Sequence, residues 1–341
     1  MRSLKFIALC AALASLAAGG AKAATLDDVK AKGHLQCGIN TGLPGFAFTD
    51  NRGNWQGFDV AYCEALAAAI FGKARGNVKY TNLTGKTRFP ALASGEVDVL
   101  SRNTTWTYSR DTDLKQTFVG VNYYDGQGFI VPKSLGVGSA LELNGASVCI
   151  QTGTTTELNL AGYFRDNNMD YEPVPIETNA EAIKLYQAGR CDAYTTDASG
   201  LAATKAAFDS PGDHVVLPEI ISKEPLGPLV RHGDDEWADI ARWVLNALII
   251  AEEKGITRRN VKRMARRSGD DAEANRMFGN EGSFHEMLRL PKTWARDAIA
   301  ENGNYGEIFE KYIGRNTDLG LERGVNALWT QGGILYAPPF R

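Results

Sequence analysis

The sequence contains little that could carry out catalysis. Its four histidines are widely spaced, none within four residues of another, and no HExxH or Cys/His metal spacing occurs. The G-x-S-x-G motif of hydrolases and the G-x-G-x-x-G dinucleotide motif are absent. Gly-Lys-Thr at 85–87 is not a P-loop, because Tyr80 stands where the first glycine belongs. We therefore expect no catalytic residue, no metal and no cofactor, and favour a binding protein over an enzyme.

The chain also lacks an excess of positive charge and a long apolar run in its body. The formal net charge is −3, so the composition lacks the excess of basic residues that is typical of nucleic-acid-binding proteins. The apolar stretch 243–251 is short and flanked by charged residues, which predicts a buried amphipathic helix rather than a membrane span. The basic run 257–269 is interpreted as a solvated helix face rather than a binding patch.

The first 23 residues have the features of a secretory signal. Two basic residues precede an apolar stretch from Phe6 to Ala18, and small residues lead to an A-x-A cleavage site that ends at Ala23. A short membrane anchor is the alternative, but the apolar stretch is too short to span comfortably. Cleavage leaves 318 of the 341 residues and changes the net charge from −3 to −6, because Arg2, Lys5 and Lys22 are lost. The mature chain is long enough for two lobes, each with its own core.

Two halves of the chain repeat one pattern. A short apolar strand that carries a cysteine and ends in Thr-Gly occurs at 35–42 and again at 147–153. Later in each half, at 91–101 and 185–196, a short helix ends at a glycine and a strand that opens on aspartate follows. Strands that alternate with helices predict an α/β fold with parallel sheets covered on both faces. In such sheets the ligand lies beyond the carboxyl ends of the strands.

The cysteines left after cleavage fit this repeat. An even number in an exported protein suggests disulfides, with four buried thiols as the alternative. Cys37 and Cys63 lie in the first half, on a strand and the next helix, and Cys149 and Cys191 lie in the second half, on two strands. Of the three possible pairings, we therefore predict Cys37–Cys63 and Cys149–Cys191.

The chain is expected to cross between the halves twice. The stretch 123–136 ends the first half, and 217–230 looks like the return. The second lobe, 132–223, is then inserted into a discontinuous first lobe made of 24–131 and 224–341, which includes a long C-terminal extension. Two crossings make a hinge, and the cleft between the lobes is the natural place for a ligand.

In the first half of the chain, a predicted strand is followed by side chains that suit a carboxylate ligand. The stretch SRNTTWTYSR, residues 101–110, holds six hydroxyl groups and two arginines. The carboxylate of a free amino acid favours a bidentate guanidinium together with hydroxyls or backbone N–H groups, and Arg110 and its neighbours offer these. The alternative is a surface ion pair of Arg110 with Asp111 or Asp113.

The second half supplies the complementary groups. Residues 151–157, QTGTTTE, begin a helix whose N–H groups and dipole favour an anion, and Thr154 and Glu157 are expected to form a capping box. Asp197 follows the next strand and offers a carboxylate to an ammonium group, although it would also suit the N-cap of the helix behind it. A zwitterionic α-amino acid could therefore bridge the two lobes and hold them closed.

At this point the chain resembles a known family. The stretch GFDVAYCEALAAAI, residues 57–70, is similar to the signature of the periplasmic solute-binding proteins of polar amino acid ABC transporters (family 3), with Ala61 in place of the usual second acidic residue. The stretches RFPALASGEVDVLSRNTTWTYSRD, NYYDGQGF and GRCDAYTTDASGL resemble the general L-amino-acid-binding subgroup. The resemblance implies a two-lobed periplasmic binding protein fold, type II-like, in which a two-segment hinge joins two βα lobes.

The resemblance also implies how the ligand backbone would be held. Arg110 falls on the family's carboxylate-binding arginine, Thr105 on its companion hydroxyl, and Asn103, with Thr104 beside it, on a nearby contact. Thr155 falls on the carboxylate contact of the second lobe, and Asp197 falls on the aspartate that binds the ammonium.

Two further positions concern the ligand side chain. The aromatic lid of the family falls on Phe46 or Phe48. Arg102 stands where smaller residues are common, and from this we infer a contact to the side chains of Glu, Asp, Gln or Asn. The alternative for Arg102 is a salt bridge at the edge of the cleft.

The resemblance implies a monomeric periplasmic receptor that captures free L-amino acids, with polar, acidic and amide side chains favoured. It would deliver them to the membrane permease subunits of an ABC transporter with a cytoplasmic ATPase. The alternative is a periplasmic dehydratase of the cyclohexadienyl or arogenate type on the same fold, which would need a general acid in the cleft.

Overall fold

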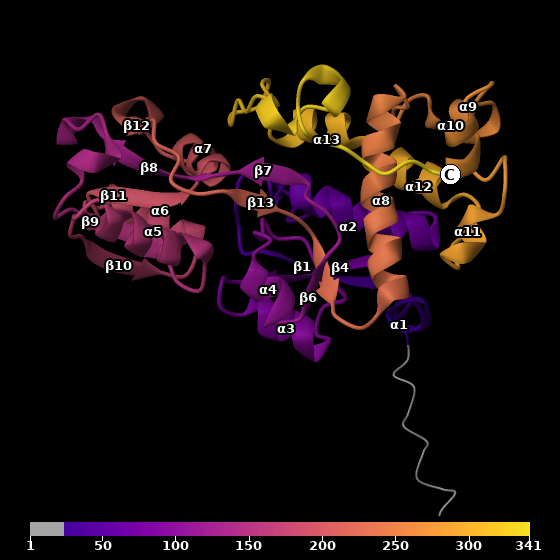
Figure 1. Cartoon of the computed structure of the whole chain (residues 1–341), viewed down its shortest axis with the longest axis horizontal. Coiled ribbons are helices and arrows are strands. Elements are labelled where there is room, and N and C mark those ends of the chain that lie inside the picture. Colours follow the sequence, from indigo (N-terminus) through magenta and orange to yellow (C-terminus); the bar gives the residue numbers. More distant parts are fainter. Residues whose placement is uncertain (1–23) are drawn as a thin grey trace, which may run out of the picture.

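The computed structural model describes residues 24–341 and divides them into two lobes, each built on a five-stranded sheet (Figure 1). The predicted signal peptide, with its cleavage site after Ala23, lies outside the described residues. Within residues 24–341 no helix is long and apolar enough to cross a membrane. The α/β fold predicted from the sequence is confirmed.

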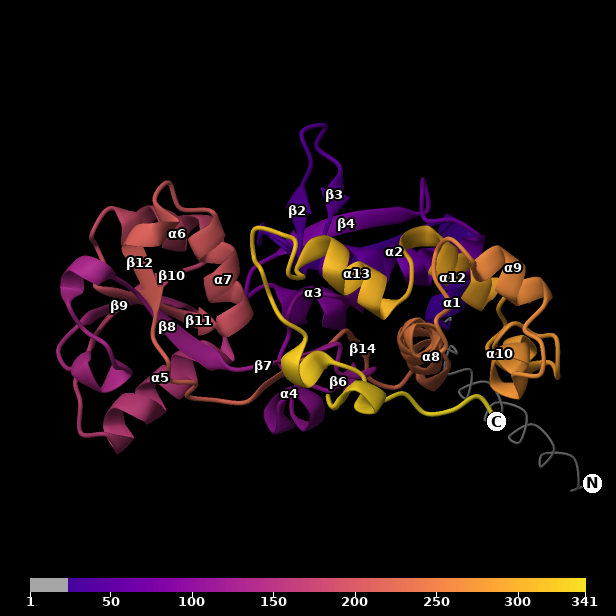
Figure 2. The same ribbon diagram turned by 90° about the horizontal axis from the view of Figure 1, so that it is seen from above.

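The sheet of the first lobe has the strand order β4-β1-β5-β14-β6. The strand β1 runs parallel to β4 and β5, whereas β14 runs antiparallel to β5 and β6. The bounds are β1 (Leu35–Asn40), β4 (Val78–Leu83), β5 (Val99–Leu100), β6 (Gln116–Phe118) and β14 (Leu229–Arg231). A small hairpin, β2 (Phe48–Thr49) and β3 (Trp55–Gln56), projects from this lobe (Figure 2).

Five helices lie in the first lobe before the C-terminal extension begins. The helix α2 is apolar nearly all round and is buried along its length, and α8 packs against it in the main core. The helix α3 ends at Gly95, whose positive φ of 84° allows the left-handed turn into β5. The bounds are α1 (Thr25–Lys32), α2 (Phe58–Phe71), α3 (Arg88–Ser94), α4 (Tyr108–Thr112) and α8 (Asp235–Glu253).

The sheet of the second lobe has the order β10-β9-β11-β8-β12 and repeats the first. Its first three strands are parallel, and β8 is antiparallel to β11 and β12. The elements are β8 (Gln127–Pro132), β9 (Ser147–Gln151), β10 (Glu172–Ile176), β11 (Ala193–Asp197), β12 (His214–Val216), α5 (Thr155–Asp166), α6 (Asn179–Gln187), α7 (Ala198–Ala206) and three short 3₁₀ turns, η1 (Lys133–Leu135), η2 (Ala140–Glu142) and η3 (Pro211–Asp213).

Two antiparallel strands, β7 (Tyr123–Asp125) and β13 (Glu224–Leu226), join the lobes. They lie side by side between the two sheets (Figure 1). Because β8 already belongs to the second sheet, the first crossing falls at β7. The division predicted from the sequence, with a boundary between Val131 and Pro132 and an inserted second lobe, stays a prediction, and the strand order favours a first boundary one strand earlier.

The C-terminal extension packs on the first lobe (Figure 2). The helix α12 lies against α2 and α8, and α13 lies against α8. The extension also reaches the hinge, because Asn326 accepts a hydrogen bond from the Tyr124 N–H (2.6 Å) and donates one to the Tyr124 carbonyl (3.0 Å). Its elements are α9 (Val261–Arg266), α10 (Ala272–Met277), α11 (Phe284–Met287), α12 (Trp294–Asn302), α13 (Tyr305–Tyr312), η4 (Gly324–Asn326) and η5 (Trp329–Gln331).

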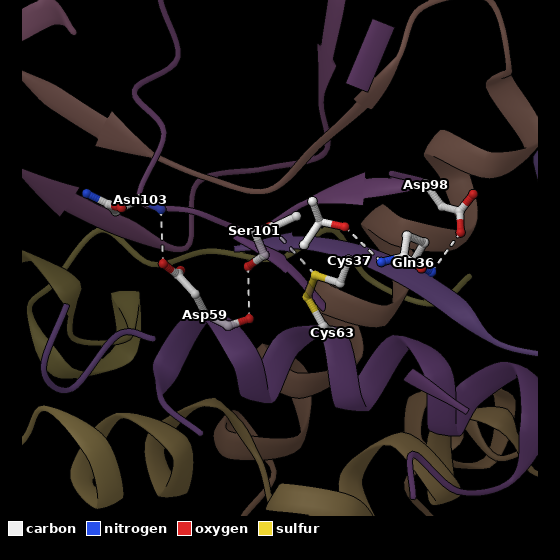
Figure 3. The surroundings of a disulfide bond; sticks show 9 residues. Gln36, Cys37, Asp59, Cys63, Asp98, Ser101 and Asn103 are labelled. Carbon is white, nitrogen blue, oxygen red and sulfur yellow. Dashed lines mark hydrogen bonds between the residues drawn. A yellow bond between two sulfur atoms is a disulfide. The ribbon is translucent and has the colours of Figure 1, made fainter. Parts of the chain in front are cut away.

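The disulfides are Cys37–Cys63 and Cys149–Cys191, as predicted. Each fixes the second strand in the sheet of its own lobe, because Cys37 lies on β1 and Cys149 on β9. Figure 3 shows the first of them, which ties β1 to α2. The alternative of four free thiols is wrong, and no disulfide within residues 24–341 crosses between the lobes.

Candidate ligand-binding site

Three arginines of the first lobe are buried where the two lobes meet. Arg88 begins α3, Arg102 follows β5, and Arg110 lies in α4; their exposed fractions are 2%, 3% and 6%. Each donates a hydrogen bond within its own lobe, Arg88 to the Thr104 hydroxyl (3.2 Å), Arg102 to the Leu83 carbonyl (2.8 Å) and Arg110 to the Thr105 carbonyl (2.9 Å). Within residues 24–341 none of the three forms an ion pair, so their charge is not neutralised by direct contact.

Burial is unfavourable for these cations. Removal from water lowers the pKa of Arg102 and of Arg110 to about 10. The pKa of Arg88 falls well below its ordinary value, first because of burial and then because Arg102 and Arg110 lie nearby. The Nε of Arg88 is buried without a hydrogen-bond partner among the described residues. A buried charge without a partner is costly, so this arrangement favours the entry of an anion.

The surface ion pair considered for Arg110 is not formed. Asp111 instead accepts a hydrogen bond from the Trp106 indole N–H (3.1 Å), and the Trp106 ring stacks on Phe118. Arg110 itself is turned inward, with its guanidinium over the ring of Phe89. The salt bridge considered for Arg102 at the cleft edge is also wrong, because the side chain is buried and its Nε is bound to Leu83.

Two buried carboxylates and one half-buried carboxylate, that of Asp125, face these arginines from the second lobe and the hinge. Asp197 lies at the end of β11, Asp125 on β7 and Glu224 on β13, with Asp197 and Glu224 exposed by only 7% and 2%. Burial raises the pKa of Asp197 well above its ordinary value, and the neighbouring Asp125 and Glu224 raise it further, while Arg88 and Arg110 oppose them. Burial likewise raises the pKa of Asp125 to about 6.

Another residue caps the helix that follows Asp197. Asp197 occupies the N-cap position of α7, yet its side chain makes no capping hydrogen bond. Asp125 does this instead, accepting hydrogen bonds from the Ser199 N–H (3.3 Å) and the Ser199 hydroxyl (2.5 Å). The capping role considered for Asp197 is therefore wrong, and its carboxylate remains available to a cation.

A pair of hydroxyls joins the lobes next to these charges. The Oγ1 atoms of Thr105, from the first lobe, and Thr155, from the second, lie 3.4 Å apart. Both hydroxyls donate to the same carboxylate oxygen of Glu224, Oε2, at 2.5 and 2.9 Å. We call the set of Arg88, Arg102, Arg110, Thr105, Thr155, Asp125, Asp197 and Glu224 the interlobe site.

The predicted capping box at the start of α5 is not formed. Thr154 occupies the N-cap position, but its hydroxyl donates to the Gln151 carbonyl (2.7 Å) and caps no N–H group. Glu157 accepts from the Gly153 N–H (3.2 Å) rather than from the N-cap residue. The helix nevertheless begins where expected, and it presents Thr155 to the interlobe site.

Asn103 and Thr104 support the arginine-bearing loop. The Asn103 N–H donates to Asp59 (3.0 Å; Figure 3). The Asn103 side-chain oxygen accepts from Asn40 (3.0 Å). Burial raises the pKa of Asp59 to about 7. Thr104 is fully buried between Arg88, from which it accepts, and the Arg102 carbonyl, to which it donates at 3.0 Å. A direct ligand contact by either residue stays a prediction.

The two aromatic candidates lie apart from this group. Phe46 is 1% exposed and packs edge-to-face on Phe58 and Tyr123 in the core of the first lobe. Phe48 is partly exposed on β2 and lines a different cavity of about 370 Å³, together with Leu319 of the extension. The burial of Phe46 opposes the lid role, which for both residues stays a prediction.

Sequence reasoning missed Arg88, Asp125 and Glu224. Arg88 directly follows the Gly-Lys-Thr that was rejected as a P-loop, and nothing in its local sequence distinguishes it from a helix-start residue. Asp125 and Glu224 lie in the two stretches identified as crossings, which is the one signal that could have found them, since a hinge borders the cleft. Within residues 24–341 no cluster of three His, Cys, Asp or Glu side chains could hold a metal ion.

Two lobes on a two-strand hinge, with opposite charges buried between them, are the architecture of a solute-binding protein. The family model for bacterial extracellular solute-binding proteins, family 3, matches residues 35–259, and the chain belongs to this family.

Three similar proteins cover nearly the whole chain. The glutamate/glutamine/aspartate/asparagine-binding protein BztA of Rhodobacter capsulatus is 60% identical over 330 residues, 97% of each chain. The general L-amino acid-binding periplasmic protein AapJ of Rhizobium johnstonii is 55% identical over 336 residues, 98% of each chain. A solved periplasmic binding protein of an ABC transporter from Brucella ovis, with glutathione bound, superposes with a TM-score of 0.90 at 55% identity, over 94% of this chain and all of that one.

Proposed function

We propose that this chain is the periplasmic receptor of an ABC importer and binds free L-amino acids in the interlobe site. The observation that carries the proposal is the separation of charge between the lobes. Buried arginines of the first lobe lack carboxylate partners, while the second lobe and the hinge hold buried carboxylates. A zwitterion placed between them would satisfy both sides at once.

In this arrangement each end of the amino acid backbone meets one lobe. Arg110 binds the α-carboxylate, because its buried guanidinium makes a single hydrogen bond among the described residues, to the Thr105 carbonyl, and keeps its other N–H groups for the ligand. Asp197 binds the α-ammonium, since its carboxylate caps no helix. Because the ligand touches both lobes, it stabilises the closed state over the open one.

Arg88 and Arg102 give the site a second place for an anion. One α-carboxylate uses one guanidinium, so two buried cations remain for the ligand side chain. Arg88 is the better placed of the two, because its Nε has no partner among the described residues whereas the Nε of Arg102 is bound to Leu83. This favours side chains with carboxylate or amide oxygens, namely those of Glu, Asp, Gln and Asn, which are also the ligands in the name of the relative BztA.

The glutathione held by the solved relative suggests a second ligand class. The γ-glutamyl end of glutathione carries a free α-carboxylate and α-ammonium on one carbon, as a free amino acid does. The same Arg110 and Asp197 contacts would therefore serve both ligands. Only the volume around Arg88 and Arg102 would decide whether the rest of the peptide fits.

The dehydratase alternative is not favoured. The relatives that match over nearly the whole length are named for amino-acid binding and transport. An amino-acid receptor releases its ligand unchanged, so incubation with arogenate or prephenate should yield no aromatic product.

We further propose that the receptor acts as a monomer, is exported by cleavage near Ala23 and hands its ligand to the permease subunits.

A thermal-shift panel tests the proposal. The mature chain, freed of carried-over ligand, is heated with each of the twenty L-amino acids and with glutathione. At ~100-fold excess over Kd, a bound ligand should add about 2.7 kcal/mol to the free energy of unfolding. Glu, Asp, Gln and Asn are expected to give the largest shifts. The absence of a shift with every compound would contradict the proposal.

A further inference from the structure

Glu224 is the most heavily hydrogen-bonded carboxylate of the interlobe site. It lies on the returning hinge strand β13 and is 2% exposed. Its Oε2 accepts from Thr105 of the first lobe (2.5 Å) and from Thr155 of the second (2.9 Å). Its Oε1 accepts from the Asn159 amide (2.7 Å) and the Ser222 hydroxyl (2.6 Å). One side chain is thus bound by both lobes and by the hinge itself.

The contacts of Oε1 connect Glu224 to a hydrogen-bond network in the second lobe. Asn159 donates to Glu224 and also to the Gln127 side-chain oxygen (3.0 Å), and Gln127 in turn donates to the Thr195 hydroxyl (2.9 Å) and the Thr156 carbonyl (3.1 Å). This network lies within the second lobe and is largely buried. Moving the carboxylate out of place would break four hydrogen bonds and leave several buried groups unsatisfied, which makes displacement by a ligand unfavourable.

The direction of the two threonine bonds determines what the hydroxyls can recognise. A hydroxyl has a single hydrogen and two lone pairs. When Thr105 and Thr155 both donate to Glu224, neither has a hydrogen left for another acceptor. The remaining lone pairs can only accept, and they lie next to a negative carboxylate. This paired surface attracts a donor with positive charge and repels an anion.

We infer that Glu224 is a positioning residue that orients the Thr105 and Thr155 hydroxyls as acceptors, so that this pair recognises the α-ammonium of the ligand and excludes compounds without one. The inference rests on the proposed function and refines it. It reverses the expectation from sequence that Thr105 and Thr155 bind the α-carboxylate. The carboxylate is left to Arg110, while the ammonium is bound by Asp197 from one side and by the threonine pair from the other.

The inference predicts a sharp rule for the ligand class. The site takes compounds with a free primary ammonium next to a carboxylate, and rejects dicarboxylates and N-acylated amino acids of the same size. L-Glutamate and glutarate form the matched pair, because glutarate is glutamate without the amino group. Rejection of glutarate by the arginine-rich first lobe alone would be hard to explain, since two carboxylates suit three arginines.

Calorimetric titration of L-glutamate and glutarate into three forms of the chain tests the inference. The wild type is expected to bind glutamate and to show no measurable heat with glutarate. In Glu224→Ala the threonines regain their hydrogens as donors, so the affinity for glutamate should fall at least about tenfold, the effect of losing charge-assisted hydrogen bonds, while glutarate binding should become measurable. Glu224→Gln keeps an oxygen acceptor for the threonines, so it should retain more of the preference for glutamate than Glu224→Ala does.

Glu219→Ala is the matched control. Glu219 also accepts hydrogen bonds from a hydroxyl and an N–H group, those of Ser139 (2.6 Å) and Ala140 (3.0 Å), but these lie within the second lobe. It should leave both affinities unchanged. Circular dichroism and the melting temperature without ligand establish that each variant is folded.

Three results would overturn the inference. Tighter binding of glutamate by Glu224→Ala would make Glu224 an internal competitor for the ligand carboxylate. An equal loss for both compounds, with the preference unchanged, would leave Glu224 a purely structural role. Failure of the wild type to bind any L-amino acid would remove the proposed function first, and the inference with it.

Discussion

The two lobes have the same arrangement of strands, but they carry residues of opposite charge where they meet. The strand orders β4-β1-β5-β14-β6 and β10-β9-β11-β8-β12 correspond one to one, and in each lobe the antiparallel fourth strand is the one that leaves the hinge. Yet the residues after the third strand differ. Arg102 follows β5, whereas Asp197 ends β11. The repeated scaffold brings polar groups to the same place from two sides, and the difference in charge makes that place suitable for a zwitterion.

The repeat extends to details that have no part in ligand binding. Asp98 accepts a hydrogen bond from the Gln36 N–H (2.8 Å) at the start of β1, and Asp192 accepts one from the Ser147 N–H (2.8 Å) at the start of β9. These two aspartates were the sequence signal for the repeat, and both fix a strand to its parallel neighbour. Features shared by the lobes therefore maintain the fold, and features in which the lobes differ form the site.

The largest effect is expected when the cation of the first lobe is removed. Arg110→Ala should weaken the binding of every L-amino acid by at least about 100-fold, within the ~2–5 kcal/mol typical of truncating one partner of a buried charged hydrogen bond. The exposed Arg259→Ala, on the C-terminal extension, is the control and should change nothing. Titration calorimetry with L-glutamate and L-glutamine measures both. Retained binding in Arg110→Ala would reject Arg110 as the carboxylate anchor.

A smaller and more selective effect should separate the two other arginines of the same lobe. Arg88→Met should lower the affinity for L-glutamate and L-aspartate by about 10- to 100-fold, the range for losing a charge-assisted contact, and that for neutral amino acids by much less. Arg102→Met should change this ratio less, because its Nε is bound to Leu83. Ratios of Kd measured for L-glutamate and L-glutamine test the difference. The opposite ranking would assign specificity to Arg102, as the sequence suggested.

The acid of the second lobe should make binding depend on pH. In the ligand-free chain the pKa of Asp197 is raised well above its ordinary value and that of Asp125 is about 6, so part of this pair is protonated in mildly acidic solution. A ligand ammonium favours the ionised carboxylate and lowers its pKa, so binding releases protons and affinity falls as the pH drops. The arginines, with pKa values of about 10 for Arg102 and Arg110, stay charged throughout.

L-Glutamine is the suitable ligand for this experiment, because its side chain does not titrate. Its affinity should decrease several-fold between about pH 7.5 and pH 5, and calorimetry in buffers of different ionisation enthalpy should detect proton release near pH 6. Asp197→Asn should bind more weakly at pH 7.5 and show a flatter pH profile. An affinity that rises as the pH is lowered would contradict the assignment of Asp197 to the ammonium.

The smallest effect on binding is expected in the extension, which only one lobe carries. Asn326 binds both backbone groups of Tyr124 on hinge strand β7. Asn326→Ala should lower the free energy of unfolding by about 1–3 kcal/mol, the cost of leaving buried backbone groups unsatisfied, while ligand affinity changes little. Urea denaturation measures this, with the exposed Asn316→Ala as control. An unchanged stability would show that the extension does not brace the hinge.

The sequence predicted features that depend on local pattern or on the internal repeat. The strands that carry Cys37 and Cys149 and both disulfides follow from such patterns and are confirmed, while the inserted second lobe stays a prediction. Arg110 and Asp197 were identified because each follows a strand end. Their alternative roles were settled only by contacts with distant residues, such as the capping of α7 by Asp125, which lies 74 residues from Ser199.

What the sequence could not predict depends on long-range packing. Glu224 meets Thr105 across 119 residues and Thr155 across 69, and no local spacing records this. The resemblance placed an aromatic lid on Phe46 or Phe48, and no local pattern shows that Phe46 is buried against Phe58 and Tyr123. The capping box at Thr154 is not formed because the hydroxyl is turned back toward the Gln151 carbonyl, to which it donates, and accepts from no N–H group of the first helical turn.

A crystal structure of the chain with L-glutamate would test the central claim most directly. The account predicts one ligand between the lobes, with its α-carboxylate within hydrogen-bond distance of Arg110 and its ammonium within the same distance of Asp197 and of the Thr105 and Thr155 hydroxyls. The γ-carboxylate should meet Arg88. A ligand held by one lobe alone, or turned so that a carboxylate faces the threonine pair while Glu224 keeps its position, would contradict the account.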